Sequence, residues 1–155
     1  MLPPFVYGPP ILPLSKSNLG TVGFIYGLIA GEAGRPLPYQ IPPFHVDVRD
    51  IARAHVRALE LPPPAAGEKL EDRRFLISSS GVMTWDVAAK HLYEARPALR
   101  NRLPAFDKPA ELPGPLSKND TTRAKEVLGI TEYIDWRKTL EDTIDSLVEA
   151  EKTWA

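Results

Sequence analysis

The chain has no cysteine among its 155 residues. This absence excludes disulfide bonds and metal sites built from thiolates, and it is compatible with a reduced, cytoplasmic setting, which is the location we expect. The chain also lacks an excess of charge of either sign, because its formal net charge is −1. We therefore expect neither nucleic acid nor an anionic membrane surface as a partner, since both attract strongly basic proteins.

Long apolar runs are absent as well. No uninterrupted stretch approaches the roughly 18 apolar residues that a membrane-spanning helix needs. The apolar N-terminal stretch has no basic residue before Lys16 and is broken by several prolines, so it does not resemble a signal peptide. The sequence therefore predicts a soluble protein with no membrane partner.

Proline, by contrast, is abundant, with 17 residues, about twice the usual share. The prolines cluster at 3–13, 36–43, 62–64 and 97–115, and they leave the segments between nearly untouched. This distribution is typical of breaks between helices and strands. The alternative interpretation, a proline-rich peptide ligand, is less favoured because every cluster lies between periodic segments.

Short apolar runs that end in turn residues predict two buried strands, Phe5–Tyr7 and Phe75–Ser78, and alternation predicts a third at His45–Val48. Apolar residues three and four positions apart predict helices between them. Five helices are predicted. The first follows a Ser17-Asn18 cap and ends at about Ala30, the second runs from Val48 to Leu61, and the third follows a Thr84 cap and ends at Ala95. The fourth lies between Asp120 and Gly129, and the fifth runs from Asp135 to Lys152.

The helix that begins at Val48 has the clearest start signal. Asp47 is expected to accept hydrogen bonds from its first backbone amides, and Asp50 places negative charge in its first turn. Its predicted buried face consists of Val48, Ile51, Ala52, His55 and Leu59. The alternation of strands and helices indicates a parallel α/β sheet. So few strands cannot complete such a sheet, and we expect the chain to be truncated.

The residues alone offer little chemistry. Gly20, Gly23 and Gly27 are spaced much as in a dinucleotide-binding turn, but a loop and not a strand precedes them, so we interpret the spacing as coincidence. Two histidines and two aspartates could alternatively form a metal site, but we favour structural roles. Both aspartates are explained by the start of a helix, and His55 by its place on the apolar face of that helix. That set is His45, Asp47, Asp50 and His55. No metal site and no catalytic nucleophile is predicted.

Three segments nevertheless resemble, in this order, the extended short-chain dehydrogenase/reductase family, also called the NAD-dependent epimerase/dehydratase family. They are Pro3–Pro9, His45–His55, and Arg123–Gly129 with Trp136–Glu149. The resemblance is to fungal ketoreductases and aldehyde reductases, and to plant dihydroflavonol and cinnamoyl-CoA reductases. It implies a partial Rossmann-type α/β fold, with the last strands of a parallel sheet and a mostly helical substrate-binding subdomain. Residues 1–155 would be the C-terminal part, and the N-terminal dinucleotide-binding half would be absent.

The resemblance also implies where the site residues lie. The family's catalytic Tyr-x-x-x-Lys would precede the first strand, and no tyrosine here has a lysine four residues later, so no catalytic residue is predicted. Pro3, Pro4 and Val22 match positions beside the nicotinamide, although Leu2 replaces an asparagine and Val22 a serine of the family pattern. The positions on the substrate side are Phe5, Tyr26, Tyr39 and Gln40.

The implied function is the C-terminal, substrate-binding portion of an NADP(H)-dependent reductase of small aldehydes or ketones, inactive on its own. In the intact family NADP or NAD gives a hydride to the carbonyl carbon while the tyrosine protonates the oxygen, and we expect this chain alone to bind no cofactor. The alternative is a non-catalytic binding or oligomerisation module. It would pair through an open sheet edge with a copy of itself or with the missing N-terminal half.

Overall fold

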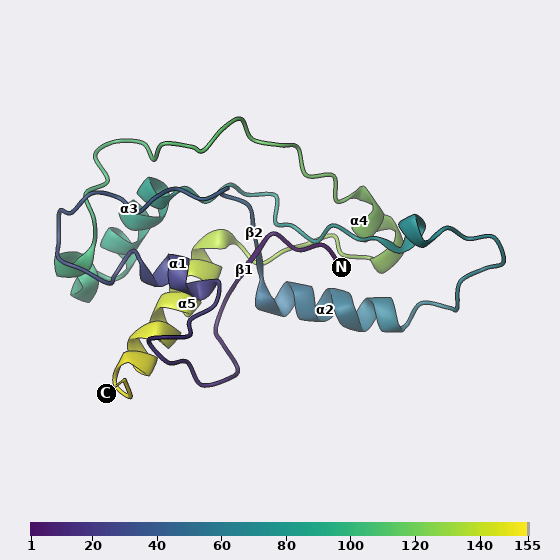
Figure 1. The fold of residues 1–155 in the computed structure, drawn as a ribbon, viewed down its shortest axis with the longest axis horizontal. Helices are drawn as coiled ribbons and strands as arrows, with labels where there is room; N and C mark the ends of the chain where they lie inside the picture. Colours follow the sequence, from purple (N-terminus) through teal and green to yellow (C-terminus); the bar gives the residue numbers. More distant parts are fainter. Residues whose placement is uncertain (155) are drawn as a thin grey trace.

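A two-stranded parallel sheet lies at the centre of the computed structural model, which describes residues 1–154 (Figure 1). Strand β1 (Phe5–Tyr7) pairs with β2 (His45–Asp47), and Phe5 lies opposite His45 in this register. Both strands were predicted from the sequence and are confirmed. The expected partial α/β fold, a short parallel sheet with mostly helical surroundings, is also confirmed.

The strand predicted at Phe75–Ser78 is wrong as a regular strand. Its segment makes one isolated parallel bridge, in which the Leu2 amide donates to the Phe75 carbonyl at 2.8 Å and the Ile77 amide donates to the Leu2 carbonyl at 3.3 Å. The ladder stops there because the two prolines after Leu2 have no N–H to donate. The segment then passes beside β2, where the Ser79 amide donates to the His45 carbonyl at 2.9 Å.

Helices make up most of the remaining regular structure. They are α1 (Val22–Tyr26), α2 (Val48–Leu59), η1 (Leu70–Arg73), α3 (Trp85–Ala95), η2 (Pro97–Arg102), α4 (Thr122–Leu128) and α5 (Trp136–Glu151), where η marks a 3₁₀ helix. The predictions of α2 to α5 are confirmed to within a few residues, and the two 3₁₀ helices were not predicted. No helix within residues 1–154 is both long and apolar enough to cross a bilayer.

The first helix is much shorter than predicted. Its expected Ser17-Asn18 cap is wrong, because Asn18 instead pairs back to Ser15 in an isolated bridge. Gly20 then adopts the left-handed backbone conformation, with φ of 55°, which interrupts any helix that passes through it. The apolar residues of this segment nevertheless point into the core, since Ile25 in α1 and Ile29 just after it are fully buried.

Two apolar clusters fill the interior. The larger one joins α1, α3 and α5, and α3 and α5 supply several of its fully buried side chains through apolar residues three or four positions apart. Those side chains include Ala88, Leu92, Leu140, Ile144 and Leu147. The smaller cluster lies between α2, α4 and the sheet, and it contains Val46, Ala54, Phe75, Ile77 and Leu128. Gly129 ends α4 in the left-handed conformation, as predicted.

The predicted buried face of α2 is largely wrong. Ile51 is buried, but Ala52 and His55 are exposed, and 86% of Leu59 is accessible to solvent. The covered side of the helix is instead formed by Asp50, Ile51 and Ala54. The reason is that α2 packs on α4, β1 and β2, which all approach it from this flank of its apolar arc.

Candidate functional site

The residues predicted to lie beside the nicotinamide come from the segment before β1 and from the start of α1. Pro3 is exposed and Pro4 half-buried in the segment that leads into the strand. Val22 is buried at the first position of α1, and the neighbouring Thr21 hydroxyl donates to the Val6 carbonyl at 2.7 Å. This bond holds the beginning of α1 against β1. Contact of the three residues with a cofactor stays a prediction.

Phe5 forms an aromatic pair that was not predicted. Its ring meets that of Phe24 edge to face, with ring centroids 5.4 Å apart, and it stacks on Tyr7 at 6.3 Å. Phe24 is 42% exposed, so one face of the pair is open to solvent. The signal that would have found Phe24 is a large aromatic residue placed away from the buried stripe of an amphipathic helix.

Tyr26 lies apart from this pair, because residues 24 and 26 project from opposite sides of α1. Its ring meets that of Trp154 edge to face, with centroids 5.3 Å apart. Burial, and then the neighbouring Glu151, raise the pKa of the Tyr26 hydroxyl. Arg102 donates to Glu151 at 2.8 Å, so Tyr26 belongs to a charged cluster at the C-terminal end of α5.

Gln40 is almost fully buried and its amide group is fully occupied. Its side-chain oxygen accepts from the Trp85 backbone amide at 2.7 Å, and its nitrogen donates to the Ile41 carbonyl at 2.7 Å. Gln40 therefore caps α3 from a distant loop. Thr84 occupies the N-cap position of α3, as predicted, but its side chain makes no capping hydrogen bond.

Tyr39 and Gln40 line a cavity of about 460 Å³ between two proline-rich loops. One loop contributes Leu37–Gln40 and the other Pro109–Pro113. The Tyr39 ring is 77% exposed, and Glu111 is the one charged residue in the lining. The structure thus brings together two of the four residues predicted to bind substrate. Phe5 and Tyr26 lie elsewhere, and substrate contact by any of the four stays a prediction.

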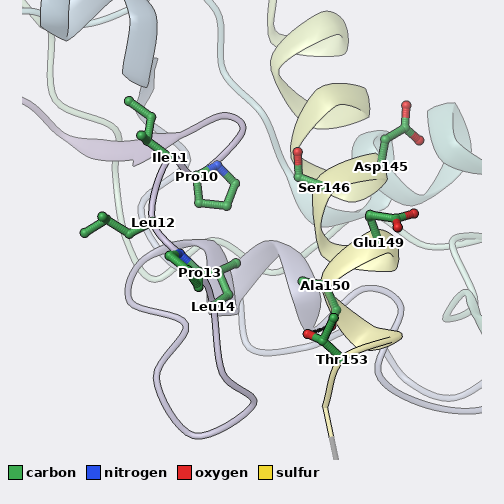
Figure 2. A pocket seen from close by; sticks show the side chains of 10 residues that line it. All are labelled: Pro10, Ile11, Leu12, Pro13, Leu14, Asp145, Ser146, Glu149, Ala150 and Thr153. Atoms are coloured by element: carbon green, nitrogen blue, oxygen red, sulfur yellow. Dashed lines mark hydrogen bonds between the residues drawn. The ribbon is translucent and has the colours of Figure 1, made fainter.

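A second cavity, of about 600 Å³, contains none of the predicted site residues. Figure 2 shows the apolar loop 10–14 on one side and polar residues of α5 on the other. The carboxylates of this wall are already paired, since Asp145 binds Arg96 and Glu149 binds Lys152. This cavity therefore offers no free charge to a ligand.

The histidines and aspartates considered as a metal site have structural roles. The Asp47 carboxylate accepts from the Arg49 backbone amide at 2.9 Å, from the Arg49 guanidinium at 2.8 Å and from the Thr139 hydroxyl at 2.7 Å. Burial alone would raise the pKa of Asp47, but these bonds outweigh it and hold the pKa below its ordinary value. The prediction that Asp47 caps α2 is confirmed.

Asp50 and His45 are buried close to this cap. Asp50 accepts from the Ile134 amide at 2.8 Å and pairs with Arg53 at 3.0 Å, and burial raises the pKa of its carboxyl. Neither ring nitrogen of His45 has a hydrogen-bond partner among the described residues, and burial lowers the pKa of His45. No group of three or more metal-binding side chains is found within residues 1–154.

Comparisons with known proteins give these features a context. No family model matches the sequence. The ketoreductase azaE of Aspergillus niger is 30% identical over 150 residues, which is 95% of this chain and 42% of that protein. GRP2 of Candida albicans, named as an NADPH-dependent methylglyoxal reductase, is 26% identical over 94% of this chain and 41% of its own length.

Solved structures agree with these relatives. The crystal structure of Gre2 from Candida albicans in complex with NADPH matches 94% of this chain and 42% of its own, with a TM-score of 0.73 and 26% identity. Vestitone reductase from alfalfa shares the fold, with a TM-score of 0.60 at 18% identity. In sequence and in fold the chain is therefore similar to members of the extended short-chain dehydrogenase/reductase family, as the resemblance implied.

Within that family the chain corresponds to the C-terminal part of fungal reductases of the Gre2 type. It spans about 42% of the length of the curated relatives it matches over nearly its full length.

Proposed function

We propose that this chain is the substrate-binding portion of an NADP(H)-dependent reductase of small aldehydes or ketones, and that it is inactive alone. The observation that carries the proposal is the 30% identity to a ketoreductase over 95% of the chain. The name of the methylglyoxal reductase supports a small carbonyl compound as substrate and NADP as the cofactor. A cytoplasmic location is part of the proposal and is supported by the absence of cysteine.

The residues of this chain suit one end of the cofactor. Pro3 is exposed beside the apolar Phe5–Phe24 pair, a surface against which a flat nicotinamide ring can lie. The pyrophosphate finds no matching cradle among the described residues, since Gly20 follows a loop and the helix after it has only five residues. When bound, the cofactor would supply the hydride, and this chain would position the ring and enclose the substrate.

Activity measurements test this proposal. The oxidation of NADPH is followed with a panel of small aldehydes and ketones, using the isolated chain and a fusion in which the N-terminal part of the Aspergillus ketoreductase precedes Met1. We expect no turnover by the isolated chain and measurable turnover by the fusion. NADPH oxidation by the isolated chain would refute its inactivity, and a folded but inactive fusion would count against the reductase assignment.

Variants of the fusion test the substrate side. Phe24→Ala removes the exposed half of the aromatic pair, and we expect it to raise the KM for apolar carbonyls. Tyr93→Ala is the matched control, because Tyr93 is an aromatic residue of similar exposure, 41%, on α3. Equal effects of the two changes would show that Phe24 has no specific role in substrate binding.

One observation favours the alternative, a non-catalytic module that pairs with another chain through its sheet edge. The sheet of the described residues has only two strands, and an isolated pair of strands is marginally stable in water. Hydrogen exchange of the Phe5–Tyr7 amides tests this function. Protection that grows with protein concentration supports pairing at the edge, and protection that does not depend on concentration excludes it.

A further inference from the structure

The space between the two proline-rich loops, here called the loop cavity, has a mostly apolar lining. It measures about 460 Å³ and lies between Leu37–Gln40 and Pro109–Pro113, which is a size usual for small-molecule sites. Six of its nine lining residues are proline, leucine or alanine, and the other three are Tyr39, Gln40 and Glu111. These three side chains therefore supply the rest of the chemistry that the lining can offer to a ligand.

The first loop is anchored on α3 by two hydrogen bonds. The Trp85 indole N–H donates to the Tyr39 carbonyl at 3.0 Å, and the Trp85 backbone amide donates to the Gln40 side-chain oxygen at 2.7 Å. The Gln40 nitrogen donates to the Ile41 carbonyl, so the amide group of Gln40 is already satisfied within the chain. Tyr39 and Glu111 are therefore the side chains that remain available to a ligand.

The segments that lead into the two loops are also joined to each other. The Gly34 amide donates to the Leu103 carbonyl at 3.0 Å, and the Ala105 amide donates to the Arg35 carbonyl at 2.8 Å. Prolines in both loops restrict the backbone further. Because both walls are restrained before a ligand arrives, binding in the cavity orders few additional groups, which lowers its entropic cost.

Glu111 gives the loop cavity one unpaired negative charge. It is exposed, and within residues 1–154 its carboxylate forms no ion pair and no hydrogen bond. The carboxylates of the larger cavity differ in this respect, since Asp145 and Glu149 are both paired. No lysine, arginine or histidine lines the loop cavity. It therefore attracts a cation and has nothing with which to hold a carboxylate or a phosphate.

Tyr39 adds an aromatic surface to the same lining. It is largely exposed, and within residues 1–154 its ring forms no aromatic pair and carries no stacked guanidinium. The face of an aromatic ring attracts an ammonium group through the negative charge of its π electrons. An aromatic ring and an unpaired carboxylate in an otherwise apolar wall are the combination that suits an ammonium group carried on an apolar body.

We propose that the loop cavity binds an organic cation, namely a protonated amine joined to a small apolar body. The ammonium group pairs with Glu111 and contacts Tyr39, and the apolar body covers the proline and leucine side chains. A sugar or another polyol suits the cavity less well, because the lining offers few free hydrogen-bonding groups. The proposal goes beyond the reductase assignment and does not depend on it, because its readout is binding to the chain and not turnover.

Titrations of the isotope-labelled 155-residue chain followed by NMR test the proposal. The probes are benzylamine, benzyl alcohol and benzoate, which carry a positive, a neutral and a negative group on the same ring. The indole N–H resonance of Trp85 is the local reporter, because this group donates to the Tyr39 carbonyl. We expect saturable shifts with millimolar benzylamine, roughly tenfold weaker binding of benzyl alcohol and no binding of benzoate. Equal affinities for benzylamine and benzyl alcohol, or no saturable shift with benzylamine, overturn the proposal.

Variants locate the binding of benzylamine. Glu111→Gln removes the charge at nearly constant size, so it should weaken benzylamine about threefold and leave benzyl alcohol unchanged. Tyr39→Leu removes the aromatic face and should also weaken benzylamine about threefold. Glu94→Gln is the matched control, because Glu94 is an exposed glutamate of α3 outside the lining, and it should have no effect. If Glu111→Gln has no effect, or no more effect than Glu94→Gln, the proposal is wrong. The three probes on the unaltered chain decide the matter if a variant fails to fold.

Discussion

Replacement of Asp47 by alanine should destabilise this fold more than replacement of any exposed helix cap. Asp47 is 1% exposed and joins three elements, because it caps α2, ends β2 and accepts from Thr139 of α5. The loss of the cap costs about 1 kcal/mol of the free energy of unfolding. The Thr139 hydroxyl, which is fully buried, would lose its acceptor, and an unpaired buried donor costs about 1–3 kcal/mol more.

The total expected loss for Asp47→Ala is therefore about 2–4 kcal/mol. Arg49 limits the damage, since its guanidinium keeps a second carboxylate, Asp142, at 2.8 Å. Urea denaturation followed by circular dichroism measures the loss. Asp135→Ala is the matched control, because Asp135 caps α5 in the same way but is exposed, and its loss should cost about 1 kcal/mol.

A double-mutant cycle with Thr139→Val makes the reasoning refutable. In the natural chain this change removes a donor to a buried carboxylate, so it should destabilise by about 1.5–3 kcal/mol. In the Asp47→Ala background it removes an orphaned hydroxyl, so it should be neutral or stabilising. If Thr139→Val destabilises both backgrounds equally, or if Asp47→Ala costs no more than Asp135→Ala, the proposed coupling between α2 and α5 is wrong.

Three further predictions concern buried or constrained residues. Burial lowers the pKa of His45, so protonation favours the unfolded chain. The free energy of unfolding should therefore fall as the pH drops below about 6.5. The same pH series on His45→Phe should lack the part of this fall that is due to His45. Gly8→Ala should destabilise by about 2–4 kcal/mol in urea titrations, because Gly8 has φ of 126° and a Cβ there would lie 2.7 Å from Val48 Cγ1. Gln40→Ala leaves the Trp85 amide without its acceptor and should cost about 1–2 kcal/mol by thermal unfolding. Gln40→Glu should not restore this stability, because a buried carboxylate would face the Ile41 carbonyl that the Gln40 nitrogen donates to.

The features that could be predicted from the sequence are local ones. Asp47 stands directly before an apolar helical pattern, and Gly129 directly after one, so a few neighbouring residues specify both helix ends. The cap of α3 could not be found in this way, because Gln40 lies 45 residues before the amide that it accepts from. The length of α1 was missed for another reason. The periodic apolar face continues through Gly20, whose left-handed conformation breaks the helix.

The candidate site shows the same division. A motif placed Pro3 and Phe5 at the start of β1, and the structure agrees because the motif and the strand coincide. Phe24 was missed because apolar periodicity predicts only the buried stripe of α1, and Phe24 lies away from that stripe. Tyr26 shares the short helix α1 with Phe24 but faces Trp154, so sequence proximity alone did not define a common site.

The error on α2 has a physical cause that bears on the partner of this chain. Apolar residues cover a wide arc of the helix, and the sequence predicts burial at the centre of that arc, whereas the fold covers only the flank that carries Ala54. The uncovered centre of this arc and the edge of the two-stranded sheet are two separate surfaces that a partner would cover. A partner that binds only at α2 would cover the first surface and leave the sheet edge open, whereas further strands of the same fold would cover both. Hydrogen exchange measured at α2 and at β1 in the same sample distinguishes the two, because only further strands protect both surfaces together.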